Sequence, residues 1–187
     1  MKKTLLIIFA GLLATSLSLS AQGRWFLDMG MGINDVISKG QFTGNSVGAQ
    51  GALGFNFNEG LGVRLTAQLG IGGASNDGYQ WFVNGRYIRA AAAADVLWDI
   101  IGTFDETPGI FRVKPYARLQ ETAGTKRGDS AMSFGVGGGL RLSIAIVDFA
   151  HVILDANSVY TPGTAWHNGP TPLFFNQVTL GFGFILK

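Results

Sequence analysis

Residues 61–71 read Leu-Gly-Val-Arg-Leu-Thr-Ala-Gln-Leu-Gly-Ile, and this stretch decides the fold. Every odd-numbered position in it is apolar, and every even-numbered position is Gly, Arg, Thr or Gln. Side chains on a β-strand point alternately to opposite faces, so the alternation predicts a strand with one apolar and one polar face. The pattern alone leaves open which face lies inside, and that question separates a membrane barrel from a soluble one.

The same alternation recurs about eight times after residue 21. We therefore expect an all-β fold: an eight-stranded, antiparallel, up-and-down transmembrane β-barrel. The run of alanines at 90–94 also favours a helix, because Ala is the best helix former. A strand is preferred there because Ile88, Val96 and Trp98 share parity with the even-numbered alanines. The expected strands are 24–33, 47–57, 61–71, 87–98, 111–121, 132–144, 150–160 and 174–186.

The N-terminus has the pattern of a secretory signal peptide. Met1-Lys2-Lys3 is followed by an apolar run over 4–13 and a stretch of small residues that ends at Ala21. Such a run is too short to span a membrane as a helix, so we expect cleavage after Ala21. This leaves one barrel domain at 22–187.

The charge of the exported chain is balanced. Removing Lys2 and Lys3 from the 14 Lys and Arg leaves 12 basic residues, which equal the 12 acidic ones. Nothing in this balance indicates a nucleic-acid partner. The chain has no Cys, so neither a lipidated N-terminus nor a disulfide framework is expected. A membrane-embedded reading must rest on strands, because no internal stretch is apolar enough for a transmembrane helix.

Connector lengths predict two different ends for the barrel. Long polar loops are expected at 34–46, 72–86 and 161–173, and a shorter one at 123–131. Tight turns are expected at the opposite end, at 58–60 and 145–149, although the connector at 99–110 is long. Long loops at one end are typical of outer-membrane barrels. Aromatic residues near strand ends, such as Trp25 and Trp98, fit either interfacial girdles or ordinary strand propensity.

Charged residues at inward positions predict a layer across the interior. Six of them fall three to five residues from the short-turn end of their strands, and hairpin arithmetic places Arg141 almost directly across from Asp155. An eight-stranded barrel is just wide enough for side chains to fill, and buried charges must pair, so we expect a plugged interior. Alternatively, some of these residues face water at the rim. The predicted interior charge layer is Asp28, Arg64, Asp95, Lys114, Arg141 and Asp155.

A second group of polar residues is predicted to line the upper lumen, above the charge layer. These side chains fill space by hydrogen bonding or, alternatively, accept an anionic ligand. The predicted upper-lumen residues are Arg89, Arg118, Gln50, Gln68, Tyr116 and Gln120.

Catalytic and cofactor motifs are missing from the sequence. The two histidines, His151 and His167, have no Cys or acidic cluster at metal-ligand spacing, so we expect no metal, no cofactor and no catalytic residue. His151 is placed near a short turn and His167 in the last long loop, where Ser130 or Ser46 are conceivable partners without any motif that links them. The glycines at 135–139 lack the Lys-Ser/Thr of a phosphate loop.

The periodicity, the signal peptide and two runs together resemble the small outer-membrane β-barrel family of OmpA/OmpX-like type. The runs are Asp95-Val96-Leu97-Trp98-Asp99 and Lys114-Pro115-Tyr116-Ala117. The resemblance covers the chain after residue 21. The sequence departs from the family pattern at its C-terminus. It ends Phe184-Ile185-Leu186-Lys187, whereas such barrels commonly end in an aromatic residue. It also has no C-terminal peptidoglycan-binding domain.

The resemblance implies a monomeric, non-enzymatic protein of a Gram-negative outer membrane with a role in envelope integrity or adhesion. Its implied partners are outer-membrane lipid and lipopolysaccharide, the barrel-assembly machinery, and a surface ligand of the external loops. Two alternatives remain. A secreted lipocalin-like barrel would bind a hydrophobic ligand and place its apolar face inside. An outer-membrane lipid-modifying enzyme would use a loop nucleophile.

Overall fold

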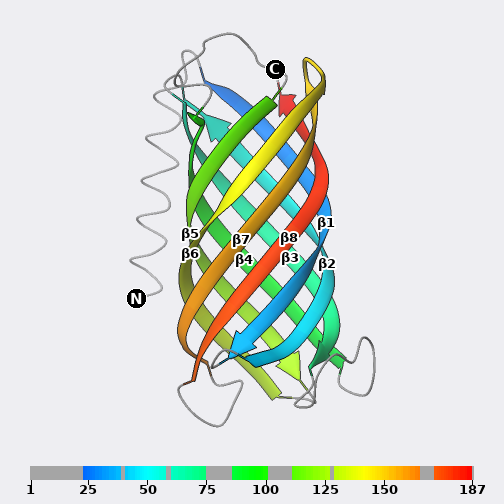
Figure 1. The fold of residues 1–187 in the computed structure, drawn as a ribbon, viewed down its shortest axis with the longest axis vertical. Coiled ribbons are helices and arrows are strands. Elements are labelled where there is room, and N and C mark those ends of the chain that lie inside the picture. The colour runs from blue at the N-terminus through cyan, green and yellow to red at the C-terminus, as the bar shows by residue number, and fades with distance from the viewer. Residues whose placement is uncertain are drawn as a thin grey trace.

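The fold is a closed β-barrel (Figure 1). The computed structural model describes residues 23–38, 41–57, 60–74, 86–100, 111–126, 129–164 and 171–186. Each strand pairs antiparallel with the next, and the last pairs with the first, which confirms the predicted eight-stranded up-and-down barrel. The strands are β1 (Arg24–Ser38), β2 (Gln41–Asn56), β3 (Leu61–Ala74), β4 (Arg86–Trp98), β5 (Phe111–Lys126), β6 (Asp129–Val147), β7 (Ala150–Thr164) and β8 (Thr171–Leu186).

The alanine run adopts the predicted strand conformation. Ala90 and Ala92 are exposed on the outer face of β4, and Ala91 and Ala93 are buried on its inner face. Pairing with β3 and β5 on both sides therefore overrides the helix propensity of Ala. No helix in the described part of the chain is long and apolar enough to cross a membrane.

The barrel has two ends that are defined by its connections. The terminal end holds the first residue of β1, the last residue of β8 and the turn at 148–149 between β6 and β7. This end is uppermost in Figure 1. At the distal end, which is lowermost, β1, β3, β5 and β7 end and β2, β4, β6 and β8 begin.

The strands run further toward the distal end than predicted. Most of the loop predicted at 34–46 is strand, because the backbone ladder continues through pairs such as Asn34 with Ser46. The loops predicted at 123–131 and 161–173 are shortened in the same way. The apolar alternation fades there, but backbone hydrogen bonding does not depend on it. The distal rim is therefore a polar extension of the barrel wall.

Cross-strand rows climb around the barrel instead of circling it at one level. Starting at Phe26 and following paired residues from strand to strand, the row passes Arg64, Asp95 and Arg118 and returns to β1 at Val36, ten residues further along. This stagger is what a closed barrel of tilted strands requires, and the tilt is plain in Figure 1. Residues at the same height along the barrel axis therefore lie at different numbers of residues from the ends of their strands.

The apolar face of the barrel points outward. On β3, Leu65 and Leu69 have 37% and 57% of their surface exposed, whereas Arg64, Thr66 and Gln68 between them are buried. Large apolar side chains on the other strands are exposed in the same way, including Met31, Leu180 and Phe182. A lipocalin-like barrel requires the opposite arrangement, and the described residues contradict it.

Glycines on the inner face allow β1 and β8 to approach closely where the barrel closes. Gly30 and Gly181 are directly paired there. A Cβ added to Gly181 would lie 2.1 Å from the Met29 carbonyl oxygen and 2.6 Å from the Gly30 Cα, which are backbone atoms that cannot step aside. Gly51 on the outer face differs, because a Cβ added there meets nothing within 4 Å.

We predict that Gly181→Ala weakens barrel closure and Gly51→Ala does not. The methyl group at Gly181 forces the backbones of β1 and β8 apart, so the free energy of unfolding should fall by about 1–3 kcal/mol. At Gly51 the change should stay within about 0.5 kcal/mol of wild type. Urea unfolding in lipid vesicles measures both variants, and equal effects at the two positions would contradict the close approach.

Candidate functional site

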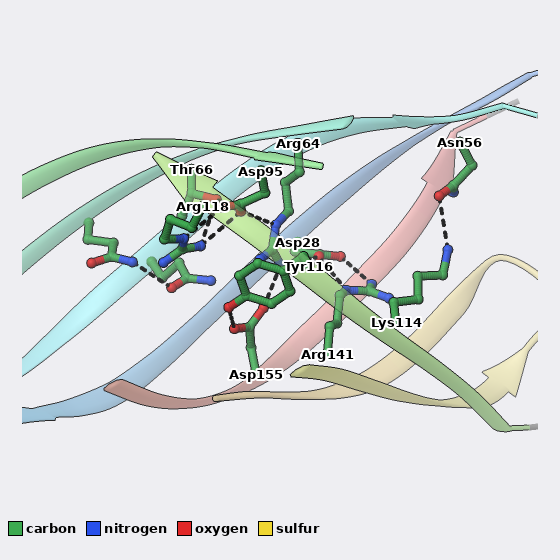
Figure 2. Close-up of polar contacts among 12 residues, drawn as sticks. Asp28, Asn56, Arg64, Thr66, Asp95, Lys114, Tyr116, Arg118, Arg141 and Asp155 are labelled. Atoms are coloured by element: carbon green, nitrogen blue, oxygen red, sulfur yellow. Dashed lines mark hydrogen bonds and ion pairs between the residues drawn. The ribbon is translucent and has the colours of Figure 1, made fainter. Parts of the chain in front are cut away.

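The barrel interior holds a network of charged side chains with Arg64 at its centre (Figure 2). The Arg64 Nε donates to Asp95 Oδ2 at 2.8 Å, and its Nη1 donates to Asp155 Oδ2 at 2.5 Å. The same Nη1 lies 3.8 Å from Asp28 Oδ2. One guanidinium from β3 therefore contacts carboxylates from β1, β4 and β7, and all four side chains are fully buried.

Arg118 and Tyr116 of β5 complete the network beside Arg64. The Arg118 Nε and Nη2 donate to the two oxygens of Asp95 at 2.7 and 2.9 Å, so this pair is bidentate. The Tyr116 hydroxyl donates to Asp155 Oδ1. The guanidinium carbons of Arg64 and Arg118 lie 4.6 and 5.2 Å from the centre of the Tyr116 ring. The ring thus adds cation–π attraction to the ion pairs.

Arg141 of β6 neutralises Asp28 with two parallel hydrogen bonds. Its Nε and Nη2 each donate to one oxygen of Asp28 at 2.8 Å. The predicted register is confirmed, because Arg141 does lie directly across from Asp155 on β7. The ion pair is different from the one that register suggests, since Asp155 is bonded by Arg64 and Tyr116.

The charges of this network balance. Three carboxylates, Asp28, Asp95 and Asp155, meet three guanidinium groups, those of Arg64, Arg118 and Arg141. Such pairs contribute little net stability over an apolar core, but loss of one member leaves an uncompensated buried charge. The arrangement therefore penalises any change that removes one charge alone.

Lys114 is predicted to belong to the interior charge layer, but in the structure it lies outside this network. It sits nearer the terminal end, where its Nζ donates to Asn56 Oδ1 at 2.9 Å and lies 3.4 Å from Asp99 Oδ2 (Figure 2). Arg112 also pairs with Asp99 at 3.0 Å. The third base of the network is Arg118, which had been predicted in the upper lumen. Tyr116 likewise lies in the network instead of above it.

The register between β4 and β5 explains this difference. Asp95 pairs across the strands with Arg118, and Lys114 pairs with Arg141 on the other side. The long connector at 99–110 leaves the β4–β5 register undetermined by turn length, so counting from strand ends placed Lys114 instead of Arg118 at the network level. Lys114 and Arg141 carry the same charge and lie opposite each other, so their repulsion favours a Lys114 side chain that points toward Asn56 and Asp99.

The remaining upper-lumen residues form a layer of amides and one guanidinium, that of Arg89, on the distal side of the network. The Gln68 Nε2 donates to Gln50 Oε1 at 3.2 Å, and Gln177 Nε2 donates to the same oxygen at 2.9 Å. Arg89 donates to Asn34 and Gln68 at 2.8 and 3.4 Å and stacks on Phe175. Gln120 donates to Thr122 at 2.9 Å.

Sequence reasoning missed several members of these layers. Asn34 and Gln177 share the inward parity of their strands, which was the signal that could have found them. Thr66, another inward residue, donates its hydroxyl to Asp95 Oδ2 at 3.2 Å. Asp99 follows the last residue of β4 and is 5% exposed, so it extends the inward row at the terminal end. Within the described ranges no group of three His, Cys, Asp or Glu is placed to hold a metal ion.

Comparison with known proteins identifies the fold. No protein-family model matches the chain, and no curated protein matches it by sequence. Solved structures do match. Neisserial surface protein A (NspA) superposes with a TM-score of 0.65 at 12% identity, covering 86% of this chain and 96% of that protein.

The chain has the fold of the small outer-membrane β-barrels. Ail, the attachment invasion locus protein of Yersinia pestis, matches with a TM-score of 0.52 at 16% identity, over 87% of this chain and 99% of Ail. OprG of Pseudomonas aeruginosa, an outer membrane protein, gives 0.54 at 12% identity, over 88% and 96%. At these identities the likeness concerns the fold.

We predict that Arg141→Met destabilises the protein because it strands Asp28, and that Asp28→Leu rescues it. The single change should lower the free energy of unfolding by about 3–5 kcal/mol, and removal of both charges should restore most of that loss. Urea unfolding of the two single variants and the double variant measures the coupling.

A second double variant, Arg141→Met with Asp155→Leu, serves as the control. Asp155 lies opposite Arg141 in register but is bonded elsewhere, so this combination should be worse than either change alone. Rescue by Asp155→Leu instead of Asp28→Leu would contradict the pairing described above.

Proposed function

We propose that this chain is an integral protein of a bacterial outer membrane, with a plugged interior and a surface-interaction or envelope-integrity role carried by its distal end. The observation that carries the proposal is the reversed polarity of the barrel. Its outer face is apolar and its inner face is charged, which is the arrangement that a lipid solvent favours and water does not.

The aromatic residues of the outer face support a membrane setting. Trp98 and Phe149 are exposed at the terminal end, and Tyr160 and Phe174 pack against each other on the outer face toward the distal end, with ring centroids 5.2 Å apart. Aromatic side chains of this kind anchor barrels at both bilayer interfaces. We infer that the polar extension of the strands beyond them keeps the distal rim in water.

The interior network supports a plug. Arg64, Arg118 and Tyr116 are buried; Arg64 on β3 reaches Asp155 on β7 across the lumen, and Arg118 and Tyr116 fill the space beside it by bonding Asp95 and Asp155. A barrel of eight strands has room for these side chains and little else. Solute passage would require several buried ion pairs to separate at once, so we infer a non-conducting barrel.

A surface role is favoured by the length of the connectors at the distal end. The connectors at the distal end include 75–85 and 165–170, which lie outside the described residues and offer 11 and 6 residues for contacts. Ail, which shares the fold, is an attachment invasion locus protein. We propose that these connectors bind a surface ligand and that outer-membrane lipid and lipopolysaccharide surround the barrel wall. The proposed partner in biogenesis is the barrel-assembly machinery. The protein is proposed to be monomeric and non-enzymatic, and to be cleaved after Ala21.

We predict that Leu65→Arg is costly in a bilayer and that Leu61→Arg is mild. Leu65 lies well within the apolar belt, where Arg costs about 2–4 kcal/mol, whereas Leu61 is the first residue of β3 at the terminal end, where the cost is about 0–1 kcal/mol. Urea unfolding in lipid vesicles gives both free energies.

The electrophoretic mobility of unboiled and boiled outer-membrane fractions provides the companion measurement. A folded barrel should migrate differently from the boiled chain, and the Leu65→Arg variant should lose the folded band at lower temperature. A protein found soluble in the periplasm, with no mobility shift and equal effects of the two arginines, would overturn the membrane proposal.

We predict that the wild-type barrel gives no steady conductance steps in planar bilayers. The reason is that Arg64 and its three carboxylates close the lumen. The recording compares protein-containing and protein-free bilayers at the same salt concentration, with insertion verified by mobility shift of the recovered protein. Stable, protein-dependent steps would contradict the plug without affecting the membrane location.

A further inference from the structure

Three polar side chains face outward in one cross-strand row of the barrel wall, which we call the polar row. Ser158 on β7 pairs with Asn176 on β8, and Asn176 pairs with Asp35 on β1. All three share the parity of the exposed apolar residues on their strands, and they are exposed or partly exposed themselves. The three strands are neighbours in the wall (Figure 1). The polar row therefore interrupts the apolar outer face on three adjacent strands.

Apolar rows flank the polar row on both sides. Toward the terminal end, Val178 pairs with Ile33, and these side chains are 53% and 47% exposed. Toward the distal end, Tyr160 pairs with Phe174, which pairs with Ile37. By contrast, every outward position of β3 is apolar or glycine. The polar row is thus a local departure from the pattern of the wall, with apolar residues beyond it.

The polar row lies close to the height of the distal aromatic residues. Along their strands, Ser158 and Asn176 are each two residues from Tyr160 and Phe174. Cross-strand rows climb toward the distal end from β7 through β8 to β1, so Asp35 reaches about the height of Tyr160. Aromatic side chains on a barrel wall sit at the headgroup level of a bilayer. In the proposed membrane setting, the polar row therefore faces lipid headgroups.

The side chains of the polar row direct their hydrogen-bonding capacity outward. Within the described part of the chain, Asp35, Asn176 and Ser158 make no side-chain hydrogen bond or ion pair with another side chain. A carboxylate accepts hydrogen bonds, whereas an amide and a hydroxyl both donate and accept them. The row therefore offers donors and acceptors to the material that surrounds the barrel.

The charge and extent of the polar row favour a neutral headgroup with several hydroxyls. Asp35 is its one charged member, and on the described parts of β7, β8 and β1 no Lys or Arg stands at an outward position. A phosphate placed there would meet a carboxylate and no cation. The row also extends over three strands that lie about 4.8 Å apart, which is more than a single ammonium group can contact.

We propose that the polar row, together with the Tyr160 and Phe174 rings, binds the sugar headgroup of a glycolipid on the outer wall. Sugar hydroxyls donate to the Asp35 carboxylate and exchange hydrogen bonds with Asn176 and Ser158. The two rings are 39% and 45% exposed, and their electron-rich faces suit the C–H bonds of a sugar. The acyl chains lie along the apolar wall toward the terminal end. This inference rests on the proposed membrane location and names the strands that hold the lipid.

Side-chain amide NMR on the full barrel tests this site. The protein is inserted into phosphatidylcholine nanodiscs, and the ¹⁵N-labelled amide of Asn176 is identified by its loss in the Asn176→Ala variant. Two glycolipids are then mixed into the discs in increasing proportion: a glucosyl diacylglycerol, which is uncharged, and lipid A, which is an acylated and phosphorylated glucosamine disaccharide. Phosphatidylethanolamine, which offers an ammonium group and no sugar, is the comparison.

We expect a saturable shift of the Asn176 amide signal with at least one glycolipid and none with phosphatidylethanolamine. A response to neither glycolipid, or an equal response to phosphatidylethanolamine, would overturn the glycolipid site. The electrophoretic mobility of the recovered protein separates this outcome from failure of the membrane proposal. A folded barrel without a response overturns the site alone, whereas a chain that does not insert into the discs overturns both.

Variants separate a built site from general attraction to the wall. Asp35→Asn should weaken the glycolipid affinity about tenfold, because one charge-assisted hydrogen bond is lost, and Tyr160→Leu should weaken it about threefold. Glu121→Gln is the matched control. It removes another exposed outward carboxylate, on β5, whose cross-strand neighbours Ala92 and Phe134 offer no side-chain hydrogen bond, so the affinity should stay unchanged. Equal weakening by Asp35→Asn and Glu121→Gln would contradict the site.

Discussion

The contact of Arg64 with three buried carboxylates is the interaction on which the rest of the structure depends. A charge removed from water is costly unless paired, and these four side chains are at most 1% exposed. Each of the three acids also accepts from a second group, which is Arg118, Tyr116 or Arg141. Every strand from which these residues come is thereby held in one relative position.

The outer wall imposes the complementary constraint. A strand whose odd positions face lipid must place its even positions in the lumen. The alternation with a period of two therefore determines which residues face lipid and which face the lumen. In β3, this period exposes Leu65 and Leu69 while it buries Arg64 and Gln68. A shift of one residue would put Arg64 in lipid and remove the centre of the network. Wall and interior therefore specify the same register, and neither needs information from the loops.

The sequence predicts most of the fold but only part of the site. What it predicts is set by local patterns, and what it misses is set by contacts across the lumen. Periodicity predicts all eight strands, and the brief turn predicted at 145–149 sets Arg141 almost directly opposite Asp155, where the structure has it. The β4–β5 connector is long, so nothing local distinguished Arg118 from Lys114 as the partner of Asp95. Even a correct register does not name ion pairs, because Arg141 reaches Asp28 on β1, 113 residues away in sequence. Contacts across the lumen depend on closure, which local patterns do not encode.

The interior network is consequently completed at the same time as the barrel closes. Asp155 lies on β7 and Arg141 on β6, so Asp155 reaches Arg64 on β3, and Arg141 reaches Asp28 on β1, only when β8 pairs with β1 and completes the wall. In an open sheet β3 would stand far from β7, and β1 far from β6, whereas Arg64 would keep its adjacent partner Asp95. Ion pairs that form only in the closed barrel stabilise that state without stabilising its open precursors. The interior charges therefore favour a single register for the β1–β8 seam, which is the junction between the first and the last strand of the barrel.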